Sequence, residues 1–81
     1  MKIKTGEGTM VDVDISESAF EKLGTTFRYG DKFIHHDDYT GKIIGVGPNK
    51  DGLLGLWVVL EGDIDEASYF APYEFHKLFS F

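Results

Sequence analysis

The chain of 81 residues contains no cysteine. Disulfides, thiolate metal sites and cysteine nucleophiles are therefore excluded. Long apolar runs are missing as well, because the run Leu53–Leu60 is far shorter than the ~18 residues of a membrane-spanning helix. The first residues, Met1–Gly6, lack the apolar region of a secretory signal. We expect a single domain over residues 1–81, in the cytoplasm or nucleus and without a membrane partner.

Positive charge is scarce and scattered. The chain has eight Lys and Arg residues and 14 Asp and Glu residues, which gives a net charge of −6. No two basic residues are adjacent in the sequence. Proteins that bind nucleic acids usually gather basic residues to neutralise phosphates. We therefore expect no nucleic-acid partner. The sign of the charge favours a basic protein or peptide instead.

Motifs for catalysis and cofactor binding are also missing. The segment Gly45-Val46-Gly47 lacks the third glycine and the Gly-Lys-Ser/Thr sequence of phosphate-binding loops. These glycines fit better as points where a strand bends, or as room beside the indole of Trp57. No serine lies in a nucleophile elbow. We therefore predict that the chain is not an enzyme and needs no cofactor.

One cluster, His35-His36-Asp37-Asp38, has the ligand chemistry that zinc prefers. On a strand, however, its residues alternate between two faces, so each face receives two of them. A complete site would need a further ligand, such as Glu74 or His76. The cluster also fits a strand that ends in a polar turn. We assign no metal to the chain and keep a small site at His35 and His36 as an alternative.

Short strand patterns separated by turns make up most of the chain. The alternation in Thr9–Ile15 predicts a half-buried strand, and Met1–Thr5 pairs with it as a hairpin. A short helix is expected from Ser16 to Leu23, capped by Ser18 or alternatively by Ser16. Further extended segments are expected within residues 25–36, 42–47, 53–60 and 67–71. Residues 73–81 predict a helical turn or a closing strand.

The run Leu53–Leu60 is the most informative strand, because it is apolar on both faces. One face carries four aliphatic side chains: Leu54, Leu56, Val58 and Leu60. We predict that Val58, at the centre of this face, is a core residue. The other face carries Trp57, and the short N-terminal segments offer little to cover it. We therefore expect a partly exposed indole at Trp57.

From Tyr29 to Leu78 the chain resembles the SH3-like barrels in the wide sense, which include Tudor, KOW and Mib/Herc2-type modules. The resemblance is carried by Tyr29-Gly30-Asp31-Lys32-Phe33, Thr40-Gly41-Lys42-Ile43-Ile44-Gly45-Val46, Leu56-Trp57-Val58-Val59-Leu60, Glu61-Gly62-Asp63 and Pro72-Tyr73-Glu74-Phe75. It implies a mainly β fold: a small SH3-like barrel or strongly bent antiparallel sheet, with an N-terminal hairpin and one short helix. A hairpin followed by a helix also suits the β-grasp fold, although this helix is short for it.

The aromatic residues provide the functional hypothesis. Segments that neighbour one another in such a meander supply five of them, Tyr39, Trp57, Tyr69, Phe70 and Tyr73, and three acids lie nearby. Tryptophan and tyrosine supply large, rigid contact area in protein interfaces. We predict a non-enzymatic module that binds a basic peptide or protein segment through Tyr39, Trp57, Tyr69, Tyr73, Asp37, Asp38 and Asp63. The alternative is a homo-oligomeric structural domain that buries its second apolar face against its own copy.

Overall fold

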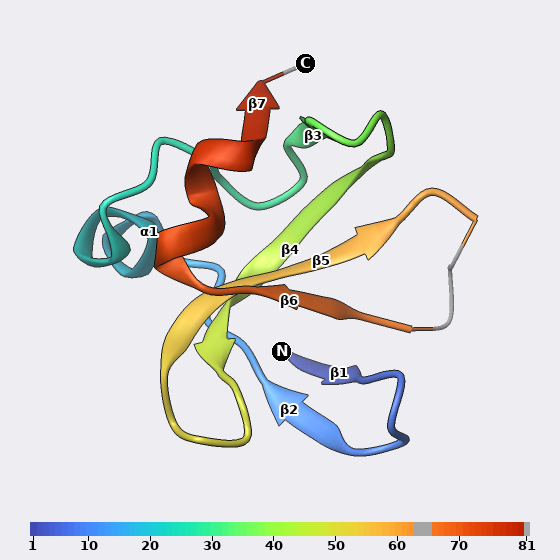
Figure 1. Ribbon diagram of the computed structural model, residues 1–81. Helices are drawn as coiled ribbons and strands as arrows, with labels where there is room; N and C mark the ends of the chain where they lie inside the picture. Colours follow the sequence, from blue (N-terminus) through green and yellow to red (C-terminus); the bar gives the residue numbers. More distant parts are fainter. Residues whose placement is uncertain (63–65, 81) are drawn as a thin grey trace.

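The computed structural model describes residues 1–62 and 66–80 and is mainly β (Figure 1). The N-terminal strands β1 (Lys2–Lys4) and β2 (Met10–Asp12) form an antiparallel hairpin, and the helix α1 (Glu17–Leu23) follows. The rest of the described chain consists of β3 (Lys32–His35), β4 (Thr40–Pro48), β5 (Leu54–Leu60), β6 (Ser68–Phe70), the 3-10 helix η1 (Pro72–Lys77) and β7 (Leu78–Ser80).

The strands from β3 to β7 form one antiparallel sheet in the order β6-β5-β4-β3-β7. Its long central pair is β4 and β5, and their register shifts between Ile43 and Gly45, where a bulge bends β4. Strands β6 and β7 are the edges, and among the described residues no strand pairing joins them. The mainly β class, the hairpin and the short helix are thus confirmed, whereas the sheet is open and does not close into a barrel.

The helix α1 is capped at both ends by its own sequence. The Ser16 hydroxyl accepts a hydrogen bond from the Ala19 N–H at 3.3 Å, and Gly24 ends the helix with a φ of 83°. Of the two predicted caps the structure uses Ser16, because Ser18 already lies inside the helix. The helix buries Phe20 completely against the sheet.

No described helix is long and apolar enough to cross a membrane.

Two apolar clusters lie on opposite faces of β5. The larger one contains nine buried residues: Phe20, Phe27, Phe33, Ile43, Val46, Leu56, Val58, Phe70 and Leu78. The smaller one contains Val13, Trp57 and Ala67. Because alternate side chains of a strand point to opposite faces, Val58 belongs to the first cluster and Trp57 to the second. The prediction that Val58 is a core residue is confirmed.

The N-terminal hairpin covers the Trp57 face. Backbone hydrogen bonds of 2.8 and 2.9 Å join Asp14 to Val46 of β4, and the Ala67 N–H donates to the Lys4 carbonyl at 3.0 Å. Gly45 lets the hairpin approach closely, because a Cβ there would stand 2.7 Å from Val13 Cβ. The second apolar face is therefore covered, in this region, by the chain itself.

The C-terminal segment forms both a helical turn and a closing strand, the two alternatives that its sequence predicts. The helix η1 begins at Pro72, whose fixed backbone angle suits a first helical position. It leads into β7, which pairs antiparallel with β3 and places Leu78 opposite His35. Leu78 is buried in the larger cluster, so the last strand adds to the core as well as to the sheet.

Replacing Val58 by aspartate should unfold the protein. The side chain is completely buried, so the substitution places a carboxylate without a partner among apolar groups. Leu54→Asp on the same strand is the matched control, since Leu54 is 52% exposed. Thermal melting followed by circular dichroism should show no cooperative transition for Val58→Asp and a nearly unchanged one for Leu54→Asp. Equal melting temperatures for the two variants would contradict the placement of Val58.

Candidate functional site

The indole of Trp57 is buried, with an exposure of 6%. The expectation of a partly exposed indole is therefore wrong. The physical reason is that the hairpin, although short, places Val13 directly against the ring, and Ala67 packs beside it. Strand periodicity predicts which face Trp57 occupies but not how far the hairpin folds over that face.

Tyr69 of β6 is the aromatic neighbour of Trp57. The two ring centroids lie 5.3 Å apart, with the planes tilted by 57°. The Tyr69 hydroxyl donates a hydrogen bond of 2.8 Å to the carbonyl of Leu53, the residue before β5. This bond holds the tyrosine ring against the start of β5. The indole Nε1–H of Trp57 is buried and has no acceptor among the described residues. An unpaired buried donor costs roughly 1–3 kcal/mol.

A hollow of about 520 Å³ opens beside this aromatic pair, between the N-terminal hairpin and the turn after β4. We call it the aromatic hollow; its apolar lining consists of Met10, Val11, Pro48, Trp57 and Tyr69. Glu7 and Asp12 add acidic groups and Lys50 adds a basic one. Met10 is 61% exposed. Met10 is not among the predicted contact residues, although its outward position in an alternating strand marks it as an exposed apolar residue.

The remaining predicted contact residues are more scattered. Tyr39 stacks on the buried His35 ring, with centroids 4.3 Å apart and planes 9° apart, and His35 stacks on Phe70 at 5.6 Å. Since Phe70 belongs to the larger cluster, Tyr39 lies on the opposite side of the sheet from Trp57. The turn that precedes Tyr39 contains two exposed acids, Asp37 and Asp38. Tyr73 is 75% exposed on η1. Asp63 lies outside the described residues.

Possible metal-ligand atoms of His35, His36 and Asp37 lie within 4.8 Å of one another. The His36 Nε2 is 3.2 Å from Asp37 Oδ1. The His35 Nδ1, however, accepts a hydrogen bond of 3.1 Å from the Asp37 N–H, which engages its lone pair. Among the described residues, neither Glu74 nor His76 joins the group. The arrangement is better explained as a packed histidine that stabilises the turn than as a metal site.

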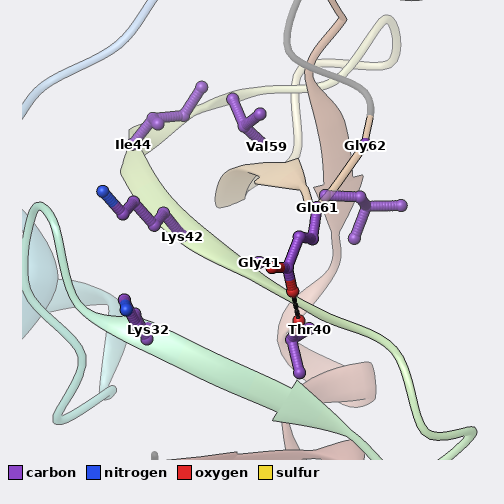
Figure 2. Close-up of a pocket in the computed structure, with 9 residues that line it drawn as sticks. Lys32, Thr40, Gly41, Lys42, Ile44, Val59, Glu61 and Gly62 are labelled. Carbon is purple, nitrogen blue, oxygen red and sulfur yellow. Dashed lines mark hydrogen bonds between the residues drawn. The ribbon is translucent and has the colours of Figure 1, made fainter.

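A second hollow of about 500 Å³ lies on the same sheet face, beyond the hairpin. We call it the lysine hollow; it is lined chiefly by Lys32, Lys42, Ile44, Val59 and Glu61 (Figure 2). The glutamate carboxylate accepts a hydrogen bond from the Thr40 hydroxyl. This hollow could not be predicted from the sequence, because the pairing of the two lysines depends on the register between β3 and β4.

Comparison with known proteins gives no match, whether to protein-family models, to curated proteins or to solved structures. The resemblance to SH3-like barrels therefore stays a prediction. What can be inferred about function rests on the residues of this chain and their geometry.

Alkaline pH should destabilise the fold through two tyrosines. Burial raises the pKa of Tyr39, and the carboxylates of Asp37 and Glu74 raise it further. Burial also raises the pKa of Tyr69. A group whose pKa is higher in the folded state than its unfolded value of about 10 contributes stability below pH 10 and loses it as the pH rises further. We expect the melting temperature to stay level from about pH 7 to pH 9 and to fall above pH 10.

Tyr69→Phe and Tyr39→Phe should each flatten this alkaline decline, whatever their effect on stability at neutral pH. Tyr29→Phe removes an exposed hydroxyl and serves as the matched control. Melting temperatures measured by circular dichroism across the pH series give the slopes directly. An unchanged alkaline slope in both variants would show that these two hydroxyls do not link folding to protonation.

Proposed function

We propose that this chain is a non-enzymatic protein-interaction module that binds a basic segment of a partner protein in the aromatic hollow. The observation that carries the proposal is the exposed Met10, which lines one hollow together with the Trp57–Tyr69 pair. Trp57 thus acts as the floor of the site and not as an exposed anchor.

The chemistry of the lining supports a basic partner. Methionine is flexible and polarizable and adapts to varied side chains, while fixed aromatic rings lose little entropy on binding. The long stems of lysine and arginine pack on such surfaces, and their charged ends interact with aromatic faces and carboxylates. Glu7 supplies a carboxylate, as does Asp12, which also pairs with the Met1 ammonium at 3.2 Å. The net charge of −6 attracts basic partners over a longer range.

The fold resemblance forms part of the proposal. The consecutive antiparallel order of β3, β4, β5 and β6 is the meander that the SH3-like resemblance implies. The bulge at Ile43–Gly45 bends the sheet as small barrels require. We therefore propose a relationship to SH3-like modules, with the N-terminal hairpin as an addition that covers part of one sheet face.

Self-association is the second candidate function, and one observation favours it. The edge strand β7 leaves Phe79 54% exposed. Edge strands with exposed apolar side chains can pair with another chain. Sedimentation of the isolated protein at micromolar concentration distinguishes the two candidates, because the interaction module is expected to be monomeric when its partner is absent.

A titration with short peptides tests the interaction module. A capped Arg-Leu-Lys-Leu-Arg peptide should shift the Trp57 indole N–H resonance in a proton–nitrogen correlation spectrum, whereas its Glu-Leu-Glu-Leu-Glu counterpart should leave it in place. Met10→Ser should weaken binding of the basic peptide about fivefold, which corresponds to roughly 1 kcal/mol of lost apolar contact. The single tryptophan makes the indole signal unambiguous.

Leu54→Ser is the control for this titration. Leu54 is exposed to a similar degree, and it lies outside the lining of the aromatic hollow. Its affinity for the basic peptide should equal that of the unchanged protein. The proposal fails if the basic peptide leaves the indole resonance unmoved, or if Met10→Ser and Leu54→Ser bind it equally well.

A further inference from the structure

Strand β2 has an open outer edge beside the aromatic hollow. The Thr5 N–H donates to the Thr9 carbonyl at 2.9 Å, and the Val13 N–H donates to the Met1 carbonyl at 2.7 Å. Because the backbone groups of successive residues in a strand point to opposite sides, those of Met10 point away from β1. Among the residues that the structure describes, no backbone hydrogen bond joins Met10 to another strand on that outer side. Its N–H and carbonyl can therefore pair with an added strand.

A proline explains why the chain itself leaves this edge unpaired. On the outer side of the hairpin, Asp14 exchanges backbone hydrogen bonds of 2.8 and 2.9 Å with Val46 of β4. Continued by two residues, the same antiparallel register places Asp12 opposite Pro48, which has no N–H to donate. The two segments are still close there, because a Cβ on Gly47 would stand 3.2 Å from the Asp12 carbonyl oxygen. Within the described part of the chain the pairing goes no further, and the aromatic hollow lies beyond it.

The half-buried Asn49 lines the other side of the hollow, from the turn after β4. Its side-chain oxygen accepts hydrogen bonds from the Asp51 and Leu53 N–H groups at 2.9 and 3.0 Å. These two donors fix the orientation of the amide, because a flipped side chain would place its NH2 group against them. The NH2 group makes no hydrogen bond within the described residues 1–62 and 66–80. It is therefore a preoriented donor at the margin of the hollow.

We propose that the partner segment lies in the aromatic hollow as an extended strand, which Met10 and Asn49 bind through its main chain. The inference rests on the function proposed above and specifies how the partner is held. One residue of the segment would exchange backbone hydrogen bonds with Met10, as when a strand is added to an open sheet edge. The carbonyls of its two neighbours would point to the other side, where the Asn49 NH2 group donates to one of them.

An extended segment also matches the side chains around the hollow. Successive side chains of a strand point to opposite faces, so alternate residues of the segment would contact the floor formed by Trp57 and Tyr69. The residues between them would lie beside the outward side chain of Met10, on which the aliphatic stems of lysine and arginine can pack. The expected partner sequence therefore alternates apolar and basic residues.

Two methylated forms of the capped Arg-Leu-Lys-Leu-Arg peptide test the strand directly. One carries N-methyl groups on both leucines, and the other carries them on the central lysine and the last arginine. The two sets of residues point their N–H groups to opposite edges of a strand. Only the edge that faces Met10 needs N–H donors, because Asn49 itself donates. We expect one methylated peptide to bind within about twofold of the unmethylated peptide, and the other about tenfold more weakly.

The variant Asn49→Asp tests the second anchor. Its carboxylate still accepts from the Asp51 and Leu53 N–H groups, so the turn is retained, but the NH2 donors are lost. The unmethylated basic peptide should bind about fivefold more weakly, although the added negative charge attracts it. Asp51→Asn makes the reverse exchange on the same turn, outside the lining of the hollow, and should leave the affinity within about twofold of the original.

Hydrogen exchange measures the bond at the edge of β2. With saturating basic peptide, the Met10 amide should exchange about tenfold more slowly than in the free protein, because its N–H gains an acceptor. The Asp14 amide is the internal control, since the Val46 carbonyl already accepts from it at 2.8 Å. Its exchange should slow much less than that of Met10.

The outcomes separate this inference from the proposed function. A basic peptide that leaves the Trp57 indole resonance unmoved would overturn both. If the peptide moves that resonance but its two methylated forms bind alike, the extended mode is overturned and the interaction module stands. Equal affinities for Asn49→Asp and Asp51→Asn, or equal slowing of the Met10 and Asp14 amides, would likewise overturn the extended mode alone.

Discussion

The packing of Val13 against Trp57 is the contact on which the second side of the sheet depends. Val13 is 3% exposed, and it lies where side chains at Gly45 and Gly47 would otherwise stand. Burying an apolar side chain of this size contributes roughly 1.5–3 kcal/mol. The Asp14–Val46 backbone hydrogen bonds hold the hairpin in the matching position. Without this contact the indole of Trp57 would face water.

The limited reach of the hairpin explains why two hollows border the same face. At the Trp57 end, the gap between the hairpin and the turn after β4 leaves the aromatic hollow, with Met10 and acids at its margin. At the Val59 end, the uncovered stripe becomes the floor of the lysine hollow. The opposite face carries the larger cluster, to which α1, β6 and β7 contribute Phe20, Phe70 and Leu78.

Local patterns in the sequence predict most of the fold. Alternation places Val58 in the core, glycine and proline mark the turns, and a serine cap with Gly24 delimits α1. The open sheet edge and the burial of Trp57 could not be predicted in this way, because both depend on long-range pairing. The candidate site was only partly predictable for the same reason. Trp57 and Tyr69 do meet, whereas Tyr39 follows His35 to the other face.

The N-terminal hairpin of the chain covers its single indole, that of Trp57. Quenching of Trp57 fluorescence by acrylamide in the isolated protein tests it most directly. Folded protein should show a blue-shifted emission and a quenching constant several times smaller than the same protein in concentrated urea. A folded protein whose indole is quenched as readily as in urea would contradict the claim, because Val13 could not then lie against the ring.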